Sequence, residues 1–228
     1  MREIVLDTET TGLDPVTGDR IVEIGAVELY NHLPTGQTFH VYINPERDMP
    51  REAEAVHGLG TAFLKDKPTF AAIAQSFEDF IGDARLVIHN ASFDIGFLNA
   101  EFGYLGRPPL LQERVLDTLM LARRKHPGGS NSLDALCRRY GIDNSKRAKH
   151  GALLDSELLA EVYLELIGGR QTALTLGVVT TPKTMRVQAP ITLGQRPLPL
   201  PNRITAEDRE AHHQFVVALG EGALWNQN

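Results

Sequence analysis

The sequence predicts an α/β fold, with one mixed β-sheet, helices on its faces and an extended C-terminal tail. Three strand-like segments with short connections come first, which favours antiparallel pairing. Helical and strand-like segments then alternate, which adds further strands and covering helices. After Gly168-Gly169 the composition changes, since residues 177–203 hold five prolines and few large apolar side chains. That stretch is typical of a linker.

The first three strands are expected at residues 3–9, 20–30 and 38–44, and they should form an antiparallel meander. The first is a short apolar run that ends at a Thr-Gly turn. The second and third show the two-residue alternation of strands. It is clearest in the third, where one face carries Phe39, Val41 and Ile43.

The helical part is expected to begin after Lys67-Pro68-Thr69, a good helix start. Apolar side chains then recur at helical spacing, at Phe70, Ile73, Phe77, Phe80 and Ile81. The elements that follow should be a strand at 85–90, a helix at 93–104, a short strand near 114–117, and helices near 118–125, 132–140 and 152–167.

Length and composition bound the class of protein. A chain of 228 residues is enough for one sizeable domain and an appendage, and 42% hydrophobic with 23% charged residues fits a soluble globular protein. The single cysteine, Cys137, excludes an internal disulfide and a Cys-rich zinc site, which favours the reducing cytoplasm. The N-terminus has no signal-peptide core, and no apolar run reaches membrane-spanning length, so no membrane partner is expected.

The charge is unevenly distributed along the chain. The net charge is −6, with 17 Lys and Arg against 25 Asp and Glu in residues 1–168, and 6 against 4 in residues 169–228. This balance argues against a broadly basic nucleic-acid binder. The acidic first part would repel a polyanion unless bound cations reverse the local charge.

Two carboxylates stand at the inner end of the first strand, in the stretch EIVLDTETTG. Residues two apart in a strand point to the same face, so Asp7 and Glu9 present their charges side by side. Such a pair raises a carboxyl pKa or destabilises the strand unless a cation neutralises it. Hard oxygen ligands select Mg²⁺ or Mn²⁺ over zinc. The alternative is an exposed strand end with solvated acids.

Two later motifs add two acids and a histidine. VIHNASFDIGFL places Asp94 after a strand, and KHGALLDSELL places His150 and Asp155 around a helix start. Five residues apart, His150 and Asp155 would lie about 140° apart on a helix and would not share a face. Gly151 can turn the chain, which puts His150 on a loop and Asp155 in the first helical turn. The alternatives are a surface histidine and an acid that complements the helix dipole.

Together, the motifs DTETTG, HNASFD and HGALLD resemble the DEDDh family of 3′→5′ exonucleases, over roughly residues 3–168. The resemblance implies an RNase H-like fold and the release of 5′-mononucleotides from a 3′ end. It also implies two divalent metal ions, Mg²⁺ or Mn²⁺, that activate water and stabilise the leaving oxygen. His150 would accept the proton of that water, a role that suits a side chain titrating near neutrality. The implied metal ligands are Asp7, Glu9, Asp94 and Asp155.

Residues beside these motifs are candidate substrate contacts. By resemblance, the turn after DTETTG lines the site for the terminal nucleotide, and the histidine of EAVHGL lies against the last base. An aromatic ring next to Asp94 can stack on an unpaired base, and the preceding asparagine can brace the loop. Ordinary turn packing and core packing are the alternatives. The candidates are Thr8, Thr11, Gly12, Leu13, His57, Asn90 and Phe93.

Two basic clusters, Arg123-Arg124-Lys125 and Lys146-Arg147-Lys149, offer cations to the phosphates of an entering strand. The second cluster directly precedes His150. A solvated helix face is the better interpretation of the first cluster. His89 is interpreted as structural and Cys137 as a small core residue.

The segment QTALTL, residues 171–176, resembles the Q-x-x-L-x-[LF] peptide that bacterial replication proteins insert into the sliding clamp. An amide anchor and two apolar side chains would fill a preformed pocket of the clamp. The alternative is a frayed end of the preceding helix. The anchor residues would be Gln171, Leu174 and Leu176.

A last helical pattern occupies residues 204–219, with Thr205 as N-cap and Asp208 three residues on. An isolated amphipathic helix needs a surface on which to dock. The layout resembles the proofreading subunits of bacterial replicative polymerases. Such a subunit has an exonuclease domain (here 1–168), then a clamp-binding peptide and Pro-rich linker (169–203), then a segment that binds the polymerase subunit (204–228).

Two other functions compete with proofreading. A free-standing DEDDh exonuclease would trim RNA or short oligonucleotides, and only contacts to a 2′-hydroxyl would separate it from a DNA enzyme. Such an enzyme has no need of the tail. An inactive binding module is a poor interpretation, because all five catalytic positions are filled. The sequence leaves open whether a small accessory subunit binds the catalytic domain.

Overall fold

The structure, a computed structural model, describes residues 1–145, 147, 149–168 and 204–219. Its five strands form one sheet in the order β3-β2-β1-β4-β5. The pairs β1–β2 and β2–β3 are antiparallel, and the pairs β1–β4 and β4–β5 are parallel. The predicted mixed sheet is therefore confirmed. The strands are β1 (Arg2–Thr10), β2 (Ile21–Tyr30), β3 (Leu33–Tyr42), β4 (Arg85–Ile88) and β5 (Val115–Asp117).

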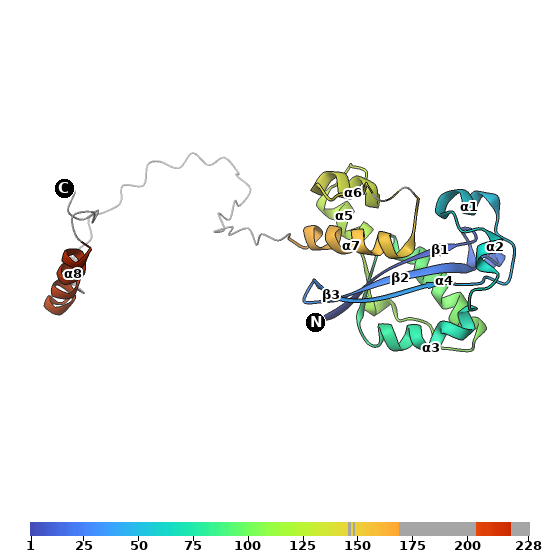
Figure 1. Ribbon diagram of the computed structural model, residues 1–228, viewed down its shortest axis with the longest axis horizontal. Coiled ribbons are helices and arrows are strands. Elements are labelled where there is room, and N and C mark those ends of the chain that lie inside the picture. The colour runs from blue at the N-terminus through green and yellow to red at the C-terminus, as the bar shows by residue number, and fades with distance from the viewer. Residues whose placement is uncertain (146, 148, 169–203, 220–228) are drawn as a thin grey trace, which may run out of the picture. The chain divides into compact units, whose positions relative to one another are not determined.

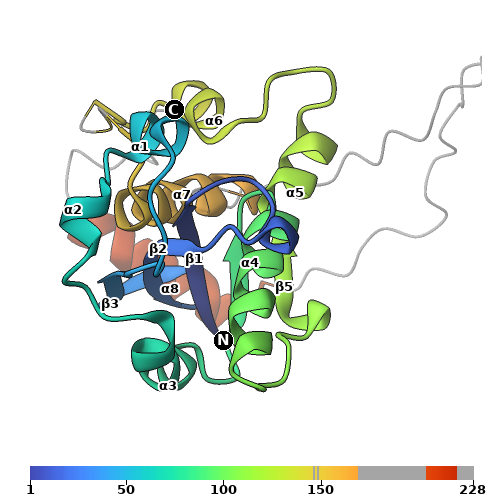
Figure 2. The same cartoon turned by 90° about the vertical axis from the view of Figure 1, so that its right-hand side faces the viewer.

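Helices cover both faces of this sheet. In Figure 1, α7 with α5 and α6 lies on one face, and α3 and α4 lie on the other. Figure 2 views the body from the end at which β1 terminates and shows the same layers. The helices are α1 (Arg51–His57), α2 (Thr61–Leu64), α3 (Phe70–Ile81), α4 (Ala91–Tyr104), α5 (Thr118–Lys125), α6 (Leu133–Tyr140), α7 (Ala152–Leu166) and α8 (Ala206–Ala218). Two short 3₁₀ turns lie at Pro15–Thr17 and Gln112–Arg114.

The alternation of β1 assigns its side chains to the two layers. Ile4 and Leu6 are fully buried in the core that α3 and α4 complete. Val5 belongs to a second cluster with Leu159 and Tyr163 of α7. Full burial of one such side chain contributes about 1.5–3 kcal/mol. Because side chains alternate along a strand, the acids that continue the odd-numbered series fall on the α7 side of the sheet.

Gly25 allows α7 to approach the sheet closely. A Cβ atom at Gly25 would lie 2.1 Å from the backbone carbon of Ala152 and 2.1 Å from the nitrogen of Leu153. The hydroxyl of Ser156 also donates a hydrogen bond to the carbonyl oxygen of Gly25, at 2.8 Å. Gly25 of β2 is the direct pairing partner of Asp7 in the neighbouring strand β1. The missing side chain therefore sets the distance between β1 and the first turn of α7.

Most predicted elements are confirmed within a few residues, but three differences stand out. The helices α1 and α2 were not predicted, because both are short and α1 is rich in charged residues. The strand β3 begins at Leu33 rather than at residue 38, because its first part is an exposed edge without an apolar face. The predicted strand 85–90 ends at Ile88, since Asn90 adopts a left-handed conformation (φ 63°) that turns the chain into α4.

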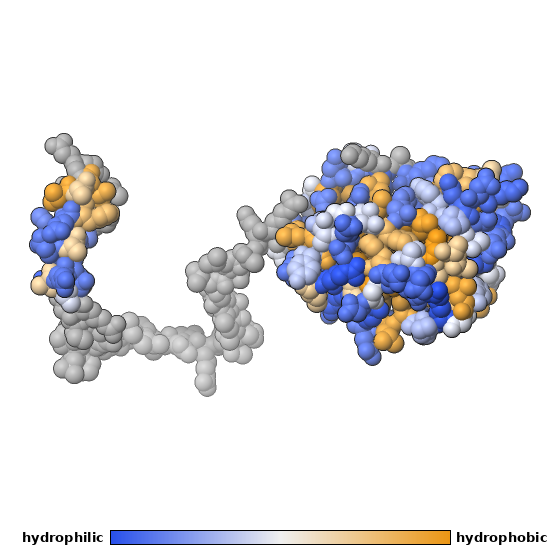
Figure 3. All heavy atoms as spheres, turned by 60° about the horizontal axis from the view of Figure 1, so that its bottom comes forward, coloured by the Kyte–Doolittle hydropathy of each residue, from blue (hydrophilic) through white to orange (hydrophobic). Residues whose placement is uncertain are grey.

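The second described part, residues 204–219, is a helix with the expected N-cap. The side chain of Thr205 accepts a hydrogen bond from the backbone of Asp208, and Asp208 reciprocates, which completes a capping box. Figure 3 shows both hydrophilic and hydrophobic side chains exposed on α8, and Phe215 is 58% exposed. None of the helices in the described ranges is long and apolar enough to cross a bilayer. The segment 171–176 lies outside the described residues.

Candidate active site

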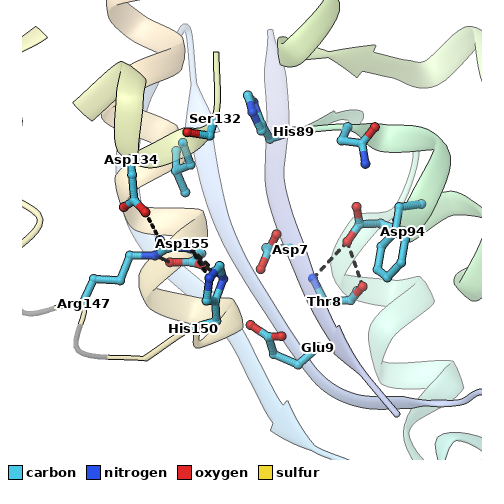
Figure 4. A pocket seen from close by; sticks show the side chains of 13 residues that line it. Asp7, Thr8, Glu9, His89, Asp94, Ser132, Asp134, Arg147, His150 and Asp155 are labelled. Atoms are coloured by element: carbon cyan, nitrogen blue, oxygen red, sulfur yellow. Dashed lines mark hydrogen bonds and ion pairs between the residues drawn. The ribbon is translucent and has the colours of Figure 1, made fainter. Parts of the chain in front are cut away.

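One cavity gathers the five predicted catalytic residues from distant parts of the chain. It has a volume of about 300 Å³ and lies beside the carboxyl end of β1. Figure 4 shows its side chains converging from β1, from α4, and from α7 with the loop before it. All five line this cavity: Asp7, Glu9, Asp94, His150 and Asp155.

The two acids of β1 stand where the strand meets α4 and α7. Glu9 is buried, and a bulge follows it between Glu9 and Thr10. Because β1 and β4 are parallel, the start of α4 lies beside this end of the strand. Asp94 accepts hydrogen bonds from the backbone nitrogen (3.0 Å) and the hydroxyl (2.7 Å) of Thr8. Its place in the first turn of α4 also suits a negative charge.

The opposite wall belongs to α7 and its preceding loop. Asp155 lies in the first turn of α7, as predicted, and is buried. His150 is on the loop with its side chain 49% exposed, and its Nδ1 lies 3.3 Å from Oδ2 of Asp155. The backbone of this loop is also bonded to α1, because the backbone nitrogen of His150 donates to the carbonyl oxygen of Val56.

Burial and mutual repulsion disfavour the charged forms of these acids. Burial, followed by the nearby charges of Asp94 and Glu9, holds the pKa of Asp7 well above its ordinary value. Burial and then Asp155 raise the pKa of Glu9 to about 8. Burial raises the pKa of Asp94 to about 7, although its hydrogen bonds with Thr8 oppose the shift. The charged forms of these acids therefore need a cation beside them.

The donor set fits divalent metal ions. Ligand atoms of Glu9, His150 and Asp155 all lie within 4.8 Å of one another. Asp7 and Asp94 add carboxylate oxygens in the same cavity. Oxygen-rich sites suit Mg²⁺ and Mn²⁺, and the raised carboxyl pKa values are those that a dication would lower again.

These pKa shifts predict a pH-dependent stability. Because the folded-state pKa values of Glu9 and Asp94 exceed their ordinary values, their stabilising contribution is present below about pH 4. It is lost as the pH rises through about 7 to 8. We expect the chelated protein to melt at a lower temperature at pH 8 than at pH 5.5, and Mn²⁺ to raise the melting temperature more at pH 8. Equal shifts by Mn²⁺ at both pH values would contradict this electrostatic picture.

A second hollow of about 560 Å³ adjoins the first and shares Thr8, Glu9 and Phe93 with it. Leu13 stands at its rim with 85% exposure, and burial lowers the pKa of His57, which favours a neutral ring. The His57 Nδ1 accepts a hydrogen bond from the backbone of Leu59, at 3.0 Å. Six candidate substrate contacts line this hollow: Thr8, Thr11, Gly12, Leu13, His57 and Phe93. The seventh, Asn90, lines the catalytic cavity.

Two residues beside the catalytic set, Arg147 and Asp134, were not individually predicted as part of the site. Arg147 was predicted only as part of a basic cluster, yet it bonds directly to Asp155. Asp134, in the first turn of α6, contacts Arg147 at 2.8 Å. The SLDAL segment that carries Asp134 contains a good N-cap, Ser132, but nothing in its spacing points to the site.

One residue of the first basic cluster, Lys125, makes structural contacts. Lys125 donates to the carbonyl oxygens of Glu165 (2.7 Å) and Leu166 (3.1 Å), so it binds the last turn of α7. His89 contacts the hydroxyl of Thr118 at 2.9 Å, which agrees with a structural role, although its ring also borders the catalytic cavity.

Comparisons with known proteins found matches over most of the chain. The family model described as Exonuclease matches residues 4–163. A DNA polymerase III subunit epsilon from Rickettsia conorii is 58% identical over 77% of this chain and 78% of its own length. The proteins of that name from Salmonella typhimurium and Escherichia coli K12 are 48% and 47% identical, each over 98% of this chain and 97% of their own length.

Solved structures share the fold. Exonuclease X in complex with 5′ overhanging duplex DNA is 26% identical, with a TM-score of 0.56 over 73% of this chain and 91% of its own. The nuclease domain of 3′hExo, a DEDDh family member bound to rAMP, has a TM-score of 0.64 at 20% identity. That likeness likewise covers 73% of this chain and 91% of the other. The expected RNase H-like sheet of DEDDh exonucleases is thereby confirmed.

Proposed function

Because the chain belongs to the Exonuclease family, and to the DNA polymerase III epsilon subunits within it, we propose that it removes mispaired 3′-terminal nucleotides during DNA replication. The enzyme is a 3′→5′ exonuclease, a phosphodiester hydrolase that releases 5′-mononucleotides. The observation that supports this best is the single cavity in which four acids and a histidine from three distant motifs meet.

The positions of the catalytic residues support the following roles. Asp7, Glu9, Asp94 and Asp155 would hold two divalent ions, which activate water and stabilise the leaving oxygen when bound. The side chain of His150 is 49% exposed, so a ring nitrogen of His150 can accept the proton of the attacking water. The new bond joins this oxygen to phosphorus, and the bond from phosphorus to the 3′ oxygen breaks.

The second hollow is the proposed site of the terminal nucleotide. It shares a wall with the catalytic cavity, so a base held there would place its 5′ phosphate near the acids. Phe93 and the neutral ring of His57 offer apolar surfaces to that base. A mispaired end frays more readily than a paired one, and the hollow accepts a nucleotide that has left its partner.

A direct assay separates proofreading from RNA trimming. A DNA duplex with a mismatched, labelled 3′ end should lose that nucleotide faster than the paired duplex, with Mg²⁺ and not with chelator. The equivalent RNA should be degraded more slowly than the DNA. Faster hydrolysis of RNA would favour the alternative, a free-standing exonuclease for RNA or short oligonucleotides.

The tail supports a place within a replication complex. We propose that Gln171, Leu174 and Leu176 bind the sliding clamp and that residues 204–228 bind the alpha subunit of DNA polymerase III. Such tethers raise the effective concentration of the nuclease at the primer end, so a net-acidic domain needs little DNA affinity of its own. Binding of a small accessory subunit and a cytoplasmic location remain predictions.

The clamp contact predicts a separation of binding from catalysis. Gln171→Ala combined with Leu174→Ala should weaken binding of purified clamp at least about tenfold, because it removes the amide anchor and one apolar plug. Hydrolysis of free single-stranded DNA should stay unchanged. The matched control is Gln188→Ala with Leu193→Ala in the linker, which should leave clamp binding intact. Equal clamp affinity of the first variant and the wild type in a titration would contradict the assignment of residues 171–176 as the clamp-binding peptide.

A further inference from the structure

Arg147 holds three partners at once beside the catalytic acids, as Figure 4 shows. Its Nε and Nη2 donate to the two carboxylate oxygens of Asp155, with Nη2 2.7 Å from Oδ2. The same Nη2 lies 2.7 Å from Nδ1 of His150, and Nη1 lies 2.8 Å from Oδ2 of Asp134. The side chain is only 8% exposed, so this is a buried, bidentate grip on a proposed metal ligand.

The contact with His150 is made against the face of its ring. The same Nη2 lies 2.7 Å from Nδ1 and 3.4 Å from Nε2 of His150. The lone pair of an imidazole nitrogen lies in the plane of the ring, so a donor on that lone pair would be much farther from the other nitrogen. Arg147 therefore covers one face of the imidazole and leaves its ring edge open.

Arg147 also competes with a dication for the carboxylate of Asp155. Both oxygens of Asp155 already accept a hydrogen bond from the guanidinium, and two cations on one carboxylate repel each other. Asp134 offers the guanidinium another partner. It already contacts Nη1, its side chain is 40% exposed, and its Oδ1 accepts a hydrogen bond from Asn144 at 3.0 Å.

We propose that Arg147 is a two-position residue, which leaves Asp155 and His150 for Asp134 when Asp155 binds a divalent ion. One movement would then open both oxygens of the metal ligand and uncover the ring of His150. This inference rests on the proposed function, because it requires Asp155 to be a metal ligand.

A double-variant cycle on the full chain tests the movement. The measured quantity is Mn²⁺ affinity by titration calorimetry at one pH. Arg147→Gln should tighten binding about tenfold, because the competing cation is gone, and Asp134→Asn should weaken it about tenfold, because Arg147 loses its alternative partner. In the Arg147→Gln background, Asp134→Asn should change nothing. The matched control is Arg20→Gln, which breaks an equally bidentate pair with the buried Glu101 and should leave the affinity unchanged.

The cycle distinguishes the movement from simpler effects. If Asp134 acted only through its charge, Asp134→Asn would weaken binding equally in both backgrounds. If Arg147 only held the loop, both single variants would shift the affinity in the same direction. Either result overturns the inference. If Arg147→Gln melts too low to titrate, Arg147→Lys replaces it, since it loses the fork and should also bind Mn²⁺ more tightly than the wild type; an unchanged affinity would then reject the inference.

Failure of this inference can be told from failure of the proposed function. If wild-type protein binds no Mn²⁺, or binds it equally well after Asp7→Asn, the metal site itself is wrong. If wild-type binding depends on Asp7 but the cycle is additive, only the movement of Arg147 is wrong.

Discussion

Asp7→Asn should abolish nucleotide release while leaving the protein folded. The substitution removes a ligand from the oxygen-rich cavity, and we expect a loss of at least about 10³-fold in the rate on single-stranded DNA with Mg²⁺. Stability should not fall, because burial and the charges of Asp94 and Glu9 already oppose ionisation of Asp7. The neutral amide removes that repulsion.

Two measurements check this expectation together. The rate of release of labelled 3′ nucleotides reports the chemistry, and a thermal melt in chelator reports the fold. Asp83→Asn is the matched control, since Asp83 is exposed and stands outside both hollows. It should keep both wild-type values. A folded Asp7→Asn variant with undiminished activity would refute the assignment of Asp7 to the metal site.

Gly25→Ala is expected to damage both the fold and the site, although Gly25 touches no substrate. The added Cβ would meet the backbone of Ala152 and Leu153 at 2.1 Å, so the first turn of α7 must move away from β1. Asp155 stands in that turn and faces Asp7 across the cavity. A displacement of about 1 Å in a catalytic group can cost about 10²-fold in rate.

The expected result is an active-site defect with a lowered melting temperature. Overpacking of this kind costs about 1–3 kcal/mol or more. The matched control is Gly103→Ala in α4, where a Cβ would meet nothing within 4 Å. That substitution should be neutral or slightly stabilising, because alanine favours the helix. If Gly25→Ala melted and hydrolysed DNA like the wild type, the close approach of α7 would not set the geometry of the site.

The catalytic set was predicted from the resemblance of three ordered motifs to the DEDDh family, whereas local patterns placed only single residues. A two-residue spacing in a strand puts Asp7 and Glu9 on one face, and Gly151 before a helical pattern puts Asp155 in a first turn. These two positions follow from backbone periodicity, but the roles of the residues came from the resemblance. The fold was predictable for a similar reason, since apolar alternation and helical spacing each indicate an element without knowledge of its neighbours.

The remaining contacts depend on distances that no local pattern encodes. Asp134 lies in α6 and Arg147 comes later in the chain, and only the packing of α6 against α7 brings Arg147 between Asp134 and Asp155. Gly25 is different, because a glycine inside a strand is a known sign of close backbone approach. That signal was available in IVEIGAVELY, but the element that approaches could not be identified from it.

The metal site can be tested directly by diffraction from crystals soaked in Mn²⁺, with data collected at the manganese absorption edge. We expect anomalous peaks enclosed by the oxygens of Asp7, Glu9, Asp94 and Asp155, with Arg147 turned toward Asp134. Well-ordered crystals with no peak in that cavity, or with manganese bound only elsewhere, would contradict it.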